Sequence, residues 1–103
     1  MSKRLAFLEK TTGEGSKDPL AWYGLALEYA GLERLDDALA TFEKLRVMNP
    51  KYVPMYLMCG QMLESMARPD EARAWLSAGI EAARRKGDAH AASELESALQ
   101  TLK

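Results

Sequence analysis

The strongest constraint on the fold of this chain is an internal repeat with a period of 34 residues. When the segment that begins at Asp18 is set above the segment that begins at Tyr52, large residues meet large ones and small residues meet small ones. The matched pairs in both halves of the unit are Trp22 with Tyr56, Leu25 with Cys59, Ala26 with Gly60, Tyr29 with Leu63, Ala38 with Ala72, and Phe42 with Leu76. Such a period indicates stacked supersecondary units that share one continuous core.

The apolar residues favour helices. Ala and Leu together supply 31 of the 103 residues, whereas Ile and Val supply three. Because β-branched residues favour strands and Ala and Leu favour helices, this usage predicts an all-α chain. The length fits one small domain.

Local signals mark where the helices begin and end. Asp18 followed by Pro19 is a strong helix start, since the carboxylate caps free amide groups and proline fits the first turn. Gly31 and the pair Asn49-Pro50 are stop signals. Between these stops, apolar residues recur at steps of three and four and predict one buried helix face: Leu35, Leu39, Phe42 and Leu45.

The repeat resembles the tetratricopeptide repeat. In the first unit the signature positions are held by Trp22, Leu25, Ala26, Tyr29, Ala38, Phe42 and Pro50, and in the second by Tyr56, Gly60, Leu63, Ala72 and Leu76. Arg84 replaces the proline of the second unit, so we expect its second helix to run on toward Gly87. The resemblance, closest to small stand-alone bacterial proteins, implies antiparallel helical hairpins in a short right-handed α-solenoid of about six helices.

The flanks complete a single expected domain. Residues 1–12 match the second helix of a unit and are predicted to pack on the helix from Pro19, with Thr12 to Ser16 as a loop. Residues 88–102 carry Ser93 and Ser97 where larger residues belong, so we predict a polar capping helix there. The expected parts are an N-terminal helix (1–12), two repeats (18–51 and 52–86) and a capping helix (88–102).

The resemblance also implies a binding surface. In the family, the first helix of each unit lines a concave groove, and the matching residues are Tyr23, Leu27, Ala30, Leu57, Met58, Gln61 and Glu64. This surface is mostly apolar and lacks the lysines and asparagines with which some family members hold a carboxylate. We therefore predict a non-enzymatic adaptor that binds an apolar or helical peptide of another protein. The alternative is a homodimer that buries the same groove.

The inventory of reactive groups predicts no enzyme and no cofactor. His90 is expected on the surface and Cys59 in the core, and one of each cannot supply a structural zinc site. The acidic pairs Asp36-Asp37 and Asp70-Glu71 lie at expected helix starts, where negative charge complements the helix dipole. The basic run 84–86 lies at an expected helix end. Met55, Met58, Met62 and Met66 are interpreted as core filler or as a tolerant binding face.

Net charge and hydropathy limit the classes of partner that we expect for this chain. A formal net charge of -1 lacks the basic excess that nucleic-acid binding requires. The longest uncharged stretch, residues 52–63, is too short to span a membrane. The single cysteine is compatible with a reducing compartment, and we expect a cytoplasmic protein.

Overall fold

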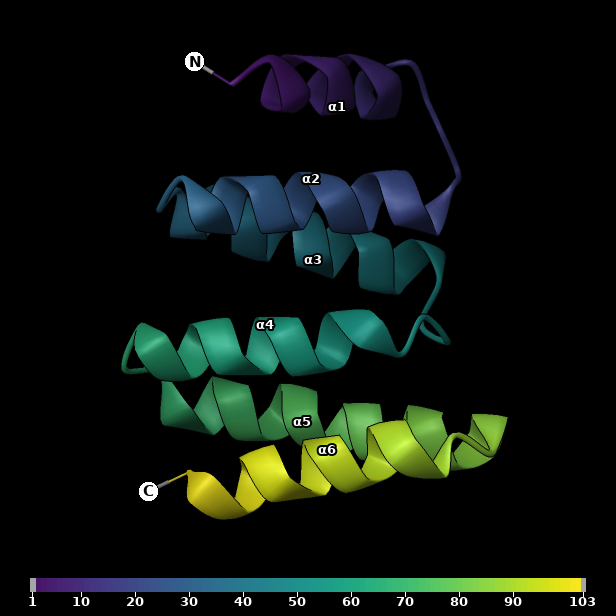
Figure 1. Ribbon diagram of the computed structural model, residues 1–103, viewed down its shortest axis with the longest axis vertical. Helices are drawn as coiled ribbons and strands as arrows, with labels where there is room; N and C mark the ends of the chain where they lie inside the picture. Colours follow the sequence, from purple (N-terminus) through teal and green to yellow (C-terminus); the bar gives the residue numbers. More distant parts are fainter. Residues whose placement is uncertain (1, 103) are drawn as a thin grey trace. The chain divides into compact units, whose positions relative to one another are not determined.

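Six α-helices make up the fold in the computed structural model, which describes residues 2–102 and contains no strand among them (Figure 1). The all-α prediction and the predicted number of helices are confirmed. The helices are α1 (Lys3–Gly13), α2 (Pro19–Gly31), α3 (Leu35–Met48), α4 (Pro54–Ser65), α5 (Pro69–Lys86) and α6 (Ala89–Thr101).

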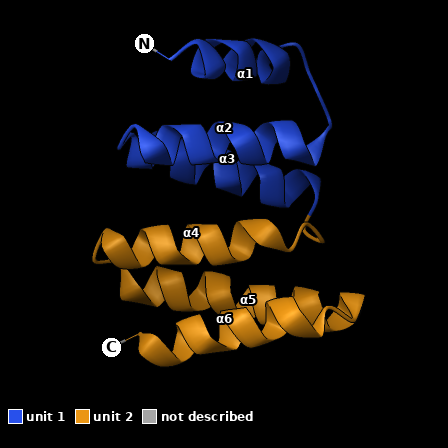
Figure 2. Ribbon diagram, viewed as in Figure 1, with its two compact units in different colours: residues 1–49 blue, residues 50–103 orange. Residues whose placement is uncertain are grey.

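The chain divides into two compact units, residues 1–49 and residues 50–103 (Figure 2). The first unit holds α1, α2 and α3, and the second holds α4, α5 and α6. In each unit two successive helices form a hairpin, α2 with α3 and α4 with α5, and a third helix packs beside it.

In the first unit, the hairpin core lies between α2 and α3. Leu25 and Ala26 on α2 are buried with Phe42 and Leu45 on α3. The third helix, α1, buries Leu5 and Leu8 and packs on α2, as predicted. Two side-chain hydrogen bonds also link α1 with α2: Ser2 Oγ donates to Glu28 Oε1 (2.9 Å), and Tyr29 Oη donates to Glu9 Oε2 (2.6 Å).

In the second unit, small residues let the helices approach closely. A Cβ atom added to Gly60 on α4 would lie 2.6 Å from Leu76 Cδ2 on α5. The α6 helix packs on both α5 and α4 and buries Ala92 and Leu95. The apolar core of this unit is therefore shared by three helices.

Most predicted helix ends are confirmed. Asp18 caps α2, with its Oδ1 accepting from the Leu20 amide (3.0 Å), and α3 ends at Met48 before Asn49-Pro50. The α5 helix runs on to Lys86 and stops at Gly87, which has the positive φ of 74° that a left-handed cap needs. Asp88 then caps α6 by accepting from the Ala91 amide (3.0 Å).

One predicted boundary is wrong. Thr12 and Gly13 belong to α1, so the loop begins at Glu14 rather than at Thr12. The reason is a side-chain hydrogen bond: Thr12 Oγ1 donates to the Leu8 carbonyl (2.9 Å), which leaves the hydroxyl satisfied inside a buried helical turn.

The turns inside the two hairpins are copies of each other. Glu33 and Ala67, one period apart, both have positive φ, 62° and 58°. The following residues, Arg34 and Arg68, donate their amides to the carbonyls of Tyr29 and Leu63 (2.9 Å each). The 34-residue repeat therefore extends to backbone conformation.

Candidate interaction site

Four predicted groove residues lie on α4 in the second unit. Leu57 is half-buried, and Met58, Gln61 and Glu64 are exposed. Because they follow one another at short helical steps, all four project from one broad side of the helix. Their apolar members, Leu57 and Met58, are accessible to a ligand on that side.

The α6 helix faces part of this surface across a pocket. The pocket has a volume of about 370 Å³, and α4 contributes Leu57 and Gln61 to it. The α6 side chains that line it are His90, Ser93, Glu94, Ser97, Ala98 and Thr101. Glu64 lines a neighbouring pocket of about 500 Å³, together with Ala67, Pro69, Thr101 and Leu102. Met58 is not among the lining residues of either pocket.

Sequence reasoning missed the contribution of α6. It treated Ser93 and Ser97 as the solvated surface of a cap, whereas both line the pocket opposite α4. The apolar stripe that contains Ala92 and Leu95 was a usable signal, because both residues are buried and the serines lie beside that stripe. That the polar side of α6 lies opposite α4 follows from the tertiary structure and not from the sequence pattern.

Several polar groups of the pocket are available to a ligand. Within residues 2–102, Gln61, Ser93 and Ser97 make no side-chain hydrogen bond. Thr101 Oγ1 donates to the Ala98 carbonyl (2.8 Å). His90 Nε2 lies 3.1 Å from Glu94 Oε1 at the pocket edge. The pocket thus combines apolar surface, from Leu57 on α4 and Ala98 on α6, with the amide of Gln61 and hydroxyl groups on α6.

The other three predicted groove residues belong to the first unit. Tyr23, Leu27 and Ala30 lie on α2, and each is half-buried. Their spacing of four and three residues places them on one face of that helix.

The remaining sequence interpretations have clear outcomes. Cys59 is fully buried and His90 is exposed, as expected. Of the four methionines, Met55 and Met62 are core residues, Met66 is half-buried and Met58 is 37% exposed. The acidic pairs lie in the first turns of α3 and α5, and the basic run 84–86 lies in the last turn of α5. Among the described residues, no group of three or more His, Cys, Asp or Glu side chains could hold a metal ion.

One titratable group in the first unit is strongly perturbed. The hydrogen bond to Glu9, together with burial, raises the pKa of Tyr29 to about 12. The phenol donates to the carboxylate, so losing its proton would break the bond and place two negative charges in contact. At pH 7 the Tyr29 phenol is therefore protonated, and its hydrogen bond to Glu9 connects α1 with α2.

Comparison with known proteins identifies the family. The family model described as tetratricopeptide repeat matches residues 29–99. The chain belongs to the tetratricopeptide repeat family. This assignment confirms the sequence resemblance.

Solved structures of bacterial proteins match most of the chain. A crystal structure of a tetratricopeptide repeat domain protein from Salinibacter ruber is 37% identical, with a TM-score of 0.74, and the match covers 81% of this chain and 92% of that one. A solution structure from the same organism gives 37% identity, a TM-score of 0.77, and coverage of 81% and 84%. A solution structure of a Bordetella parapertussis protein is 26% identical, with a TM-score of 0.81 and coverage of 97% and 87%. The search of curated proteins found no match.

Membership in the tetratricopeptide repeat family indicates a general role. Such domains are interaction modules for other proteins and typically act as non-catalytic scaffolds. Among residues 2–102, none of the helices has both the length and the apolar character that crossing a bilayer requires.

Proposed function

We propose that this tetratricopeptide repeat protein is a non-enzymatic adaptor that binds a peptide or helical segment of another protein on the first-helix side of its hairpins. The observation that carries the proposal is the pocket between α4 and α6, where Leu57 and Gln61 face Ser93 and Ser97. A concave site with a few polar groups beside an apolar wall is typical of ligand-binding sites.

The lining suggests how a peptide binds. An apolar side chain would pack against Leu57 and Ala98, which removes apolar surface from water. Ser93 and Ser97, one helical turn apart, would exchange hydrogen bonds with the polar groups of the peptide backbone. Specificity would come from both, because the hydroxyls fix orientation while the apolar contact supplies affinity.

The proposal includes the other groove residues. Met58 and Glu64 extend the surface along α4, and Tyr23, Leu27 and Ala30 occupy the matching positions on α2 in their own unit. Met58 suits a binding face because its flexible side chain adapts to different apolar groups.

Affinity capture from a native cell extract tests the proposal. We compare the wild-type chain with Leu57→Glu, which places a charge in the pocket, and with Ser77→Glu, which places the same charge on an exposed position of α5. The adaptor function predicts a protein that the wild type and Ser77→Glu capture and that Leu57→Glu does not. Circular dichroism verifies that all three chains are equally helical.

Other outcomes contradict the proposal. Equal capture by Leu57→Glu and the wild type would mean that the partner binds elsewhere. Recovery of only the protein's own copies, with a dimer mass in sedimentation that Leu57→Glu reduces to a monomer, would replace the adaptor by a homodimer that buries the groove.

A further inference from the structure

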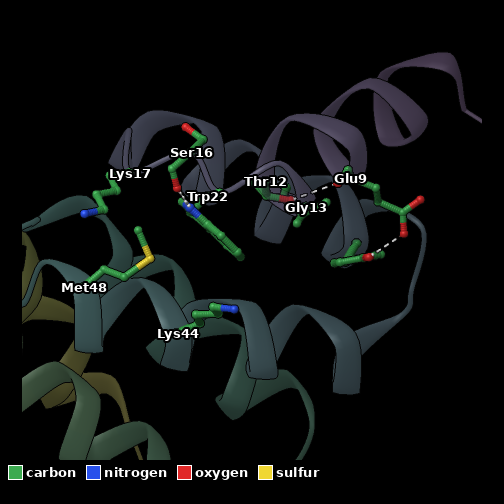
Figure 3. A pocket seen from close by; sticks show the side chains of 11 residues that line it. Glu9, Thr12, Gly13, Ser16, Lys17, Trp22, Lys44 and Met48 are labelled. Carbon is green, nitrogen blue, oxygen red and sulfur yellow. Dashed lines mark hydrogen bonds between the residues drawn. The ribbon is translucent and has the colours of Figure 1, made fainter.

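A third pocket lies wholly within the first unit, on a different set of side chains from the predicted groove. Its volume is about 820 Å³, and it is bounded by the last turn of α1, the loop after it, and the α2 and α3 helices (Figure 3). Its lining residues are Glu9, Thr12, Gly13, Gly15, Ser16, Lys17, Trp22, Leu25, Tyr29, Lys44 and Met48. None of them is a predicted groove residue.

The apolar floor of this pocket is held in place. Trp22 and Leu25 are 8% and 5% exposed, and the Trp22 indole Nε1 donates to the Ser16 carbonyl (2.7 Å). This hydrogen bond fixes the plane of the indole ring, which Figure 3 shows at the centre of the pocket. A ligand therefore meets an ordered aromatic surface with its polar atom already satisfied.

The pocket wall formed by α1 and the following loop has no side chain at two positions, Gly13 and Gly15. A Cβ atom added to Gly13 or to Gly15 would meet no atom within 4 Å. Gly15 has a φ of 89°, so a larger residue is disfavoured there on conformational grounds. Gly13 is helical, and its missing side chain leaves space on this side of the pocket.

The rim of the pocket carries two lysines, Lys17 and Lys44, without a carboxylate partner in the described part of the chain. Within residues 2–102, neither Lys17 nor Lys44 forms an ion pair, and the acid in the lining, Glu9, already accepts from the Tyr29 hydroxyl. Lys44 Nζ lies over the Trp22 ring, 5.0 Å from its centroid, in a cation–π contact. By contrast, each of these arginines pairs with a carboxylate: Arg34, Arg68, Arg73, Arg84 and Arg85.

The charge at Lys44 is not part of the repeat pattern. One period later, Lys44 corresponds to Ala78 and Met48 corresponds to Ala82, in a hairpin of the same construction. The lysine and the methionine are therefore features of the first hairpin alone.

We propose that this pocket binds a partner segment in which an apolar or aromatic side chain stands next to acidic residues. The apolar side chain packs on Trp22, Leu25 and Met48, and the carboxylates interact with the ammonium groups of Lys17 and Lys44. The site is independent of the α4–α6 pocket, because every lining residue belongs to the first unit.

An NMR titration of the full chain with two capped tripeptides tests this proposal. The acidic probe is acetyl-Phe-Glu-Glu-amide, and the neutral probe, matched in shape, is acetyl-Phe-Gln-Gln-amide. The readout is the indole N–H resonance of Trp22, with that of Trp75 in the second unit as an internal reference. We expect the acidic probe to shift the Trp22 resonance only and to bind at least about tenfold more tightly than the neutral probe.

Matched glycine variants locate the site. Gly13→Leu places a large side chain at the lining of the pocket and should abolish the shift of Trp22. Gly31→Leu, at the last residue of α2 and equally without neighbours within 4 Å, should leave the shift unchanged. Lys44→Gln should reduce the preference for the acidic probe. Equal affinity for both probes, no response of Trp22, or a response that Gly13→Leu leaves intact would each overturn the proposal.

Discussion

Gly79 on α5 lies so close to Tyr56 on α4 that a Cβ atom added to Gly79 would stand 2.5 Å from the Tyr56 Cβ. The same added atom would lie 2.9 Å from Leu95 Cδ2 on α6. Since a Cβ atom cannot rotate away from its backbone, the helices themselves would have to separate. The absence of a side chain at Gly79 thus allows the close approach of all three helices of the second unit.

Gly79→Ala should destabilise the protein. Overpacking a core costs about 1–3 kcal/mol, while replacing a helical glycine by alanine gains up to about 1 kcal/mol. We expect a net loss of about 1–2 kcal/mol in the free energy of unfolding, measured by urea denaturation. Gly31→Ala is the control, because a Cβ atom there meets nothing within 4 Å. It should be neutral or stabilising, and a Gly79→Ala variant as stable as the wild type would contradict the packing described.

Ala67→Gly should stabilise the protein. Ala67 has a φ of 58°, a left-handed conformation that costs alanine about 1 kcal/mol and glycine almost nothing. We expect the midpoint of thermal unfolding to rise. The same substitution at Ala74, an exposed helical position of α5, should lower the midpoint, since glycine weakens a helix interior by about 0.5–1 kcal/mol. Equal effects at both positions would be inconsistent with the left-handed turn.

The Tyr29 phenol should lose its proton at a higher pH than an ordinary tyrosine. Its pKa in the folded protein is about 12, above the ordinary value of 10.0. The bond to Glu9 therefore stabilises the fold fully below pH 10, and this contribution is lost as the pH rises through about 12. The difference in absorbance at about 295 nm between wild type and Tyr29→Phe should show one phenol that ionises near pH 12. A midpoint near 10 would refute the hydrogen bond to Glu9.

Deletion of residues 88–103 should unfold the second unit or cause aggregation. The α6 helix buries Leu95, which is 1% exposed, against the α4–α5 hairpin, and the loss of α6 exposes the apolar surface of the hairpin around Gly79 to water. Asp88→Ala is a milder test, since it removes the cap of α6 and should cost about 1 kcal/mol. A truncated chain that melts cooperatively at the wild-type temperature would show that α6 is dispensable.

The sequence predicts the fold well because the repeat constrains both helices of the hairpin twice, as α2–α3 and as α4–α5. Asp18, Gly31, Gly87 and Asp88 mark helix ends correctly, since each residue satisfies or interrupts the backbone in a known way. The left-handed turn at Ala67 could not be predicted, because alanine rarely adopts positive φ. There the tertiary packing of the hairpin overrides the local preference.

The candidate site is only half predictable. Leu57 and Gln61 follow from the repeat, because they occupy fixed positions on a first helix. The α6 side of the pocket does not follow from the repeat, although α2, α4 and α6 begin at the evenly spaced residues Pro19, Pro54 and Ala89. The residue types depart from the repeat pattern in α6, so Ser93 and Ser97 rather than larger residues line the pocket.

The most direct test of the account is the affinity of the captured partner for the wild type, for Leu57→Glu and for Ser77→Glu, measured by isothermal titration calorimetry. The account predicts that Leu57→Glu weakens binding by at least about tenfold, equivalent to about 1.4 kcal/mol, and that Ser77→Glu leaves the affinity unchanged. Equal affinities for the three chains would contradict an interaction site between α4 and α6.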